Sequence, residues 1–195
     1  AAAAAAAASA AGGGSGSGDA PADVRSSPLV TFLVARAAAS AAIASYLNWY
    51  LRVEISLVDD PASEIFHRVH AEMMEVLGAQ AAAGRSETQR MLENQAMLVA
   101  LIESASQKAF NGGGRFDAKV RRLNDMLSPG GEYDSIVDLD EDVVFPLDPS
   151  LRVYGIVTGV CSIFKSKTYP VSITFRVRDA REAAGAGGGG ADAGA

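Results

Sequence analysis

Residues 145–179, with the sequence FPLDPSLRVYGIVTGVCSIFKSKTYPVSITFRVRD, show the clearest β-type patterning in this chain of 195 residues. An apolar residue recurs at every second position of the segment VSITFRV, residues 171–177, and polar residues fill the positions between. This period of two places the apolar side chains on one face, as a half-buried strand requires. Shorter β-prone runs lie at residues 153–157 and 163–164. The stretch predicts a small antiparallel β part.

A polar turn, KSKTYP at residues 165–170, separates the last two β-prone runs. Its side chains include two ammonium groups, on Lys165 and Lys167, and two hydroxyls, on Ser166 and Thr168. Together with successive backbone N–H groups at a hairpin tip, such groups could hold a phosphate. The turn is the candidate binding site in this sequence.

The order of these motifs resembles the start of the catalytic domain of the phosphatidylinositol 3-kinases, and of the class III enzymes most of all. In that family a P-L-x-P segment leads into a strand with R-x-x-G-I, and an F-K-S turn closed by Pro follows. The residues of this sequence that match the pattern are Arg152, Gly155, Ile156, Phe164, Lys165, Ser166 and Pro170. Upstream, SYLNWYLRVEI at residues 45–55 resembles the Y-W-Y-x-x-V-E segment near the end of the same family's helical domain. A class I or class II enzyme of the family is a further option.

The resemblance implies an enzyme that transfers the γ-phosphate of ATP to the 3-hydroxyl of phosphatidylinositol with Mg²⁺ or Mn²⁺. It implies a location in the cytoplasm, at the periphery of endosomal and autophagosomal membranes. It also implies a protein-kinase-like scaffold subunit and a beclin-type subunit as partners. By position, the loop over the ATP phosphates would comprise Phe164, Lys165, Ser166, Lys167, Thr168 and Pro170.

Two features of the sequence depart from the family's pattern. Between Ser166 and Pro170 the family has small or apolar residues, whereas this chain has Lys167, Thr168 and Tyr169. The ATP-binding Lys of the later strands and the D-R-H-x-x-N and D-F-G motifs do not occur in the sequence. We therefore expect a fragment that is inactive alone. The alternative interpretation is a non-catalytic helical scaffold or interaction protein, because the amphipathic helices have no reactive groups.

Composition divides the chain into five segments, and the predicted fold is mainly α with a small antiparallel β part. Low-complexity Ala- and Gly-rich segments at residues 1–27 and 180–195 are predicted to be disordered. We expect a helical region at 28–131, an acidic linker at 132–150 and the start of the catalytic domain at 151–179. Periodicity predicts helices over residues 29–58, with a break near residues 39–40, and over 86–110 and 116–127. A further helix is predicted from residue 61, ended by Gly78 and the Ala/Gly run to Gly84.

Several other kinds of site are disfavoured by the sequence. The net charge of -6 argues against a nucleic-acid binder. His67 and His70 share a helix face but have no further ligand nearby, so we expect solvated helix positions rather than a metal site. The acidic stretch at 134–142 lacks the Gly and Glu that an EF-hand requires, which predicts a solvated loop. The aromatic residues Tyr46, Trp49 and Tyr50 are expected to belong to the core.

Overall fold

The computed structural model describes residues 27–56, 63–165 and 170–179. The described helices are α1 (Pro28–Ala39), α2 (Ala41–Ile55), α3 (Ser63–Ala82), α4 (Thr88–Asn111), α5 (Phe116–Met126) and the short 3-10 helix η2 (Asp134–Ile136). The described strands are β1 (Asp138–Val144), β2 (Leu151–Ile156), β3 (Ser162–Ile163), β4 (Val171–Ser172) and β5 (Phe175–Asp179). The predicted fold class, mainly α with a small antiparallel β part, is confirmed.

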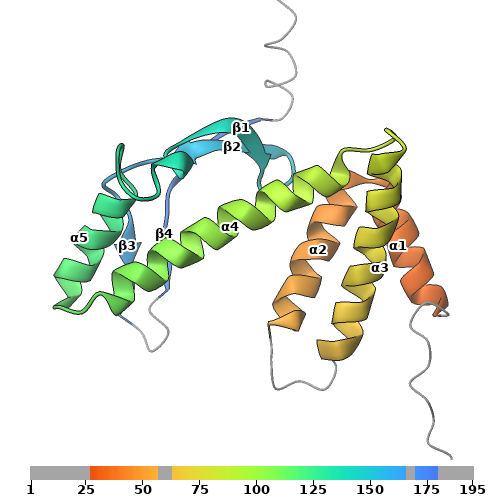
Figure 1. Ribbon diagram of the computed structural model, residues 1–195, viewed down its shortest axis with the longest axis horizontal. Helices are drawn as coiled ribbons and strands as arrows, with labels where there is room; N and C mark the ends of the chain where they lie inside the picture. Colours follow the sequence, from red (N-terminus) through yellow and green to blue (C-terminus); the bar gives the residue numbers. More distant parts are fainter. Residues whose placement is uncertain (1–26, 57–62, 166–169, 180–195) are drawn as a thin grey trace, which may run out of the picture.

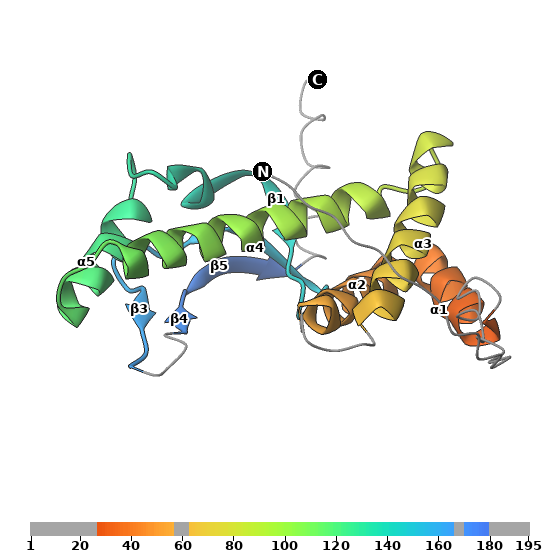
Figure 2. The same ribbon diagram turned by 60° about the horizontal axis from the view of Figure 1, so that its bottom comes forward.

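Helix α4 connects two packed regions that lie at its opposite ends (Figure 1). With 24 residues it is about 36 Å long at 1.5 Å per residue. Near its start it packs on α2 and α3, and the rest of it lies along the strands and α5 (Figures 1 and 2). Leu92 belongs to the first apolar core, and Leu98 belongs to the second. One helix therefore couples the two cores.

The helical core lies between α1, α2 and α3. The predicted break at residues 39–40 is confirmed, because Ser40 ends α1 and its hydroxyl accepts a bond from the Ile43 N–H at 3.4 Å. Helix α3 ends at Ala82, within the Ala/Gly run at residues 78–84 where the sequence predicts its end. The buried members of this core are Val30, Val34, Ala37, Ala44, Leu51, Val69, Met73, Leu77 and Leu92.

The aromatic residues of α2 are not the core positions that the sequence suggests. Tyr46 and Tyr50 are 52% and 54% exposed, and Trp49 is half-buried. The buried face of α2 instead consists of Ala44, Ser45, Asn48 and Leu51. Small and polar side chains occupy this face because α2 lies close to three other elements there.

Buried polar side chains join α2 and α4 to the connection between β1 and β2. The Gln95 amide, 2% exposed, donates to the Ser45 hydroxyl at 2.9 Å and to the Val144 carbonyl oxygen at 3.0 Å. The Ser45 hydroxyl lies 3.3 Å from the Pro146 carbonyl oxygen, which accepts from it. Buried carbonyls need such partners, so this network fixes the end of β1 and the residues that follow it against the helices.

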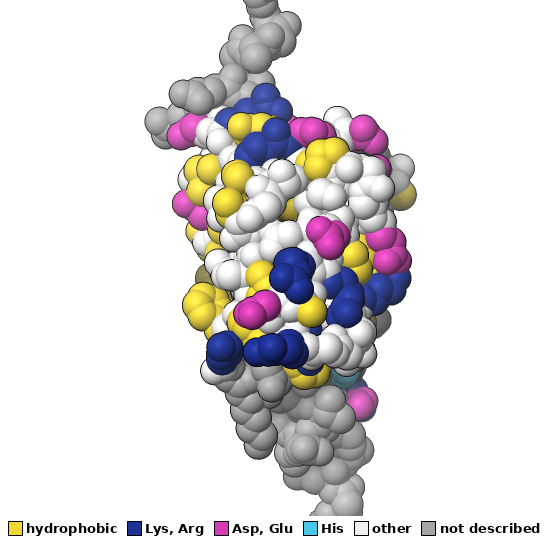
Figure 3. Space-filling view, turned by 90° about the vertical axis from the view of Figure 1, so that its left-hand side faces the viewer, with side chains coloured by type: hydrophobic (Ala, Val, Ile, Leu, Met, Phe, Trp, Pro, Cys, Tyr) yellow, Lys and Arg dark blue, Asp and Glu magenta, His cyan; other side chains and the backbone are white. Residues whose placement is uncertain are grey.

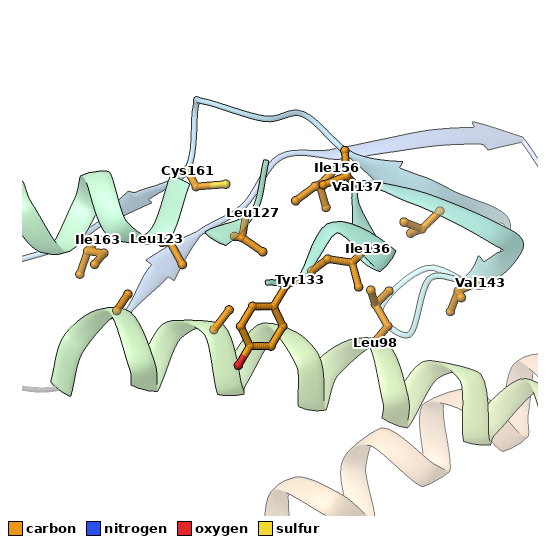
Figure 4. Close-up of a cluster of buried hydrophobic side chains, with 13 residues drawn as sticks. Leu98, Leu123, Leu127, Tyr133, Ile136, Val137, Val143, Ile156, Cys161 and Ile163 are labelled. Carbon is orange, nitrogen blue, oxygen red and sulfur yellow. The ribbon is translucent and has the colours of Figure 1, made fainter. Parts of the chain in front are cut away.

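The sheet core lies between α4, α5, η2 and the strands (Figure 4). The three-stranded sheet is antiparallel in the order β1-β2-β5, and β3 and β4 form a separate antiparallel pair. The fully or nearly fully buried members of this core are Leu98, Ala105, Ala109, Leu123, Leu127, Tyr133, Ile136, Val137, Val143, Val153, Ile156, Cys161 and Ile163.

The alternating segment 171–177 is not one strand. Its first residues form β4, which pairs with β3, and its last residues belong to β5, which pairs with β2. Between them the Thr174 carbonyl oxygen accepts from the Val157 N–H at 2.8 Å. Val171, Ile173 and Phe175 still pack against the sheet core, as the alternation predicts, whereas Val177 is 42% exposed. The chain changes strand partner within the segment, which alternation alone does not reveal.

The acidic stretch is a strand rather than the predicted solvated linker. Asp138–Val144 forms β1, with Val143 and Val144 buried. Three of its carboxylates pair with arginines, in the pairs Arg176–Asp138, Arg90–Glu141 and Arg178–Asp142. These ion pairs with β5 and α4 offset the repulsion among the acidic side chains. The sequence alone shows only the acidic run, which is typical of a loop. The domain boundary at residues 132–150 stays a prediction.

His70 contacts α2, contrary to the expected solvated position. Its Nε2 atom lies 2.9 Å from the Asn48 Oδ1 atom, and His67 is exposed. Burial lowers the pKa of His70 below its ordinary value of 6.5, and the charges of Arg52 and His67 lower it further. The neutral ring is therefore the form that the folded chain favours.

We expect the free energy of unfolding to decrease as the pH falls below 6.5. The unfolded chain takes up the His70 proton at that pH, whereas the folded chain resists it until its lowered pKa is reached. Above 6.5 this contribution is fully present. His70→Gln should flatten the dependence in thermal melts across this range. His67→Gln is the matched control and should leave most of the dependence in place; equal flattening by both variants would contradict the assignment.

Candidate functional site

The predicted polar turn, residues 165–170, connects the paired strands β3 and β4. Ser162 is paired with Ser172, and Ile163 with Val171. Beyond these pairs the Phe164 N–H donates to the Pro170 carbonyl oxygen at 2.8 Å, which closes the base of the loop. Of the predicted site residues, Ser166, Lys167 and Thr168, together with neighbouring Tyr169, lie outside the described residues. The structure places Phe164, Lys165 and Pro170.

The three described site residues are exposed, and Phe164 is 56% exposed. The Lys165 Nζ atom lies 4.8 Å from the centroid of the Phe116 ring, at the start of α5. A cation held over an aromatic face keeps its charge, and it can still donate hydrogen bonds to an anion. The geometry therefore leaves a positive charge at the edge of the hairpin tip.

An open apolar hollow of about 400 Å³ adjoins the hairpin on its β4 side. Phe164 forms part of its wall, so the hollow and the turn share a side chain. Its other lining residues are Ile102, Val171, Ser172, Ile173 and Phe175. An apolar surface next to a cationic turn offers separate contacts for a flat ring and for phosphates.

Asn124 of α5 fixes the chain just before β3, and sequence analysis missed this residue. Its amide donates to the Cys161 carbonyl oxygen at 2.8 Å and accepts from the Cys161 N–H at 3.0 Å. These two bonds pair the backbone N–H and carbonyl oxygen of Cys161, as a neighbouring strand would do in a sheet. The same amide also donates to the Val120 carbonyl oxygen one turn earlier, at 2.9 Å, as a mid-helix Asn often does, so the sequence carried no signal for the bonds to Cys161.

In the three-stranded sheet, Gly155 of β2 allows the close approach of the Val137 carbonyl oxygen and the Arg176 side chain. The Arg176 guanidinium lies over this glycine and donates to the Val137 carbonyl oxygen and to the Asp138 carboxylate. The Tyr154 ring lies between the Arg176 and Arg178 guanidinium groups, whose central carbons are 5.0 and 5.1 Å from its centroid. Thus two residues of the R-x-x-G-I pattern, Gly155 and Ile156, are buried in the sheet.

The described residues offer little other chemistry. No cluster of three or more His, Cys, Asp or Glu side chains within residues 27–56, 63–165 and 170–179 could hold a metal ion. Burial raises the pKa of the Cys161 thiol, which keeps it protonated and unreactive. In the part of the chain that is described, no helix is both long enough and apolar enough to cross a bilayer.

Comparison with known proteins identifies relatives of this chain among curated proteins. No family model matches the chain. It is 32% identical over 153 residues to phosphatidylinositol 3-kinase pik3 of Schizosaccharomyces pombe, an alignment that covers 78% of this chain and 18% of that relative. Over 155 residues it is 29% identical to the phosphatidylinositol 3-kinase catalytic subunit type 3 of Caenorhabditis elegans, covering 78% of the chain and 17% of the relative.

A plant relative gives the same result. The chain is 30% identical over 155 residues to phosphatidylinositol 3-kinase VPS34 of Arabidopsis thaliana, covering 77% of the chain and 18% of that relative. The chain thus spans less than a fifth of the length of each of these curated relatives. Over most of its length it matches one segment of class III enzymes, in agreement with the two motifs quoted above, and it belongs to the phosphatidylinositol 3-kinase family.

Proposed function

We propose that this chain is part of an enzyme that transfers the γ-phosphate of ATP to the 3-hydroxyl of phosphatidylinositol. In this proposal the β3–β4 hairpin holds its turn over the ATP phosphates. The observation that supports it best is the bond between the Phe164 N–H and the Pro170 carbonyl oxygen, because it makes a closed loop from the segment that resembles the family's phosphate loop. The names of the relatives support the reaction.

The proposed role of the turn is electrostatic. Phosphoryl transfer depends mainly on positioning the nucleotide and neutralising charge on its phosphates. Lys165 and Lys167 would supply positive charge, and the backbone N–H groups of the turn would supply donors. The adjoining hollow at Phe164 and Ile102 would contact apolar parts of a nucleotide. The described residues do not fit a divalent cation, so Mg²⁺ or Mn²⁺ would be held elsewhere in the parent enzyme.

The cellular setting is also part of the proposal. We infer a parent enzyme in the cytoplasm, at the periphery of endosomal and autophagosomal membranes. Its partners would be a protein-kinase-like scaffold subunit and a beclin-type subunit. The isolated chain would be inactive without the remaining catalytic motifs. The segments 28–131 and 151–179 would then be the end of the helical domain and the start of the catalytic domain.

We expect Ser166→Pro in the complete enzyme to lower kcat/KM for ATP by about tenfold to a hundredfold. Proline removes one N–H donor from the turn, and a hydrogen bond to a charged group contributes about 1.5–3 kcal/mol. Ser166→Ala is the companion variant, because it keeps the N–H and removes only the hydroxyl. Steady-state kinetics with varied ATP measure both. Unchanged kinetics in Ser166→Pro would show that the turn does not contact the phosphates.

A further inference from the structure

One end of this acidic protein has an excess of positive charge. Figure 3 views the molecule from the side of α5, and Lys and Arg side chains gather in the lower half of that face. Residues 108–132 contain the cations Lys108, Arg115, Lys119, Arg121 and Arg122 but only the carboxylates Asp117, Asp125 and Glu132. Lys165 joins them at the hairpin, whereas the whole chain has a net charge of -6.

The cations at this end are held in different ways. Lys108 pairs with Glu132, and Arg122 donates to the Ala109 and Gly113 carbonyl oxygens at the end of α4. Arg115 and Arg121, in contrast, are exposed and have no ion-pair partner among the described residues. Two arginines are therefore available to an anionic partner.

Two lysines at the same end lie over aromatic rings. The Lys119 Nζ atom is 3.7 Å from the centroid of the Phe110 ring, and the Lys165 Nζ atom is 4.8 Å from that of Phe116. Such side chains cover apolar surface with their stems and keep a charged group at the boundary with water. This arrangement suits a surface that is partly apolar and partly anionic.

Apolar side chains point outward next to these cations. Along β3 and its flanks Cys161 and Ile163 are buried, whereas Val160 and Phe164 are 54% and 56% exposed. The alternation places Val160 and Phe164 on the outer face of the hairpin. The two bonds between Asn124 and Cys161 hold this segment against α5, the helix that contains Lys119 and Arg121.

We propose that this surface, which we call the basic end, docks on an anionic lipid bilayer. It consists of Arg115, Lys119, Arg121 and Val160. Exposed apolar side chains surrounded by Lys and Arg are typical of surfaces that lie in the headgroup region of a membrane. The inference rests on the proposed function, because the substrate of the proposed reaction is a membrane lipid. It adds which face of this chain contacts the membrane.

The test uses the 195-residue chain and sedimentation with vesicles. Vesicles of phosphatidylcholine with phosphatidylserine are compared with vesicles of phosphatidylcholine alone. We expect binding only to the anionic vesicles and weaker binding at higher salt. Each Lys or Arg near such a surface strengthens binding roughly fivefold, so the double variant Arg115→Ala/Arg121→Ala should weaken it by more than tenfold.

A charge-matched control is available at the other end of the molecule. Arg36→Ala/Arg85→Ala removes the same charge from exposed positions in the helical region and should leave vesicle binding unchanged. Val160→Ser should weaken binding, whereas Val53→Ser, at another exposed valine, should not. Equal losses in the variants and their controls, or no binding to anionic vesicles, would overturn the proposal. Circular dichroism establishes that each variant is folded.

The same assay separates this inference from the proposed function. Ser166→Pro should not change vesicle binding, because it alters the turn and leaves the basic end intact. If vesicle binding follows the expected pattern while Ser166→Pro leaves ATP kinetics unchanged, the docking surface stands and the role of the turn is wrong. If Ser166→Pro impairs ATP use and the vesicle assay shows no selectivity for Arg115 and Arg121, the docking surface is wrong.

Discussion

A Leu98→Asp variant should lose most of the stability of the fold. Leu98 is 2% exposed and lies on α4, facing Ile136 and Val143 in the sheet core (Figure 4). A carboxylate there would be buried without a partner, which costs about 4 kcal/mol or more. Domains of this size unfold with about 5–15 kcal/mol. Thermal melts should therefore show a large drop in Tm or no cooperative transition.

The neighbouring residue provides the matched control. Met97 is 54% exposed on the same helix, so Met97→Asp adds the same charge to solvent. We expect a change within about 0.5 kcal/mol for this surface position. A similar melting temperature for Leu98→Asp and Met97→Asp would mean that α4 presents another face to the sheet.

Gly155→Ala should destabilise the sheet by about 3 kcal/mol, through overpacking. A methyl group on Gly155 would overlap the Val137 carbonyl oxygen and the Arg176 guanidinium. Because Gly155 lies in the central strand, the variant must separate β1 from β2 or displace Arg176 from Asp138. For a chain of this length the loss corresponds to a decrease in Tm of roughly 6–12 °C.

Gly78→Ala is the control for this substitution. The new methyl group would lie 3.2 Å from the Gln89 Oε1 atom, which is the end of a flexible side chain. Since Ala is a better helix former than Gly by up to about 1 kcal/mol, this change within α3 should be neutral or stabilising. Destabilisation by Gly78→Ala as large as that by Gly155→Ala would argue against a specific clash in the sheet.

Much of the helical structure could be predicted because it depends on local signals. Pro28 and Ser40 mark the start of α1 and the break between α1 and α2, and the apolar periodicity specifies the buried face of α4. Even so, Ser86 and Gln89 have the spacing of a capping box but do not form one. Ser86 accepts from the Thr88 N–H, and Gln89 donates to Glu93. Several nearby groups can bond to the Ser86 and Gln89 side chains, and the sequence does not show which of these bonds forms.

The candidate site was only partly predictable. The turn at residues 165–170 and its closure by Pro170 follow from the motif, and the bond to the Phe164 N–H agrees with that expectation. The support from Asn124 and the contact of Lys165 with Phe116 could not be inferred. Both contacts join the hairpin to α5. Contacts between elements far apart in the chain produce no periodic pattern in the sequence, so they could not be predicted from it.

The sequence by itself determined the family motifs, the five amphipathic helices and the β character of the last segment. These features depend on the order of neighbouring residues. Only the tertiary structure decided that the acidic stretch is strand β1 and that residues 171–177 divide between two pairings. It also decided that Tyr46 and Tyr50 face solvent while Ser45 and Gln95 are buried. The physical reason is that strand partners and buried polar bonds join residues far apart in the chain, and their free energy outweighs local preference.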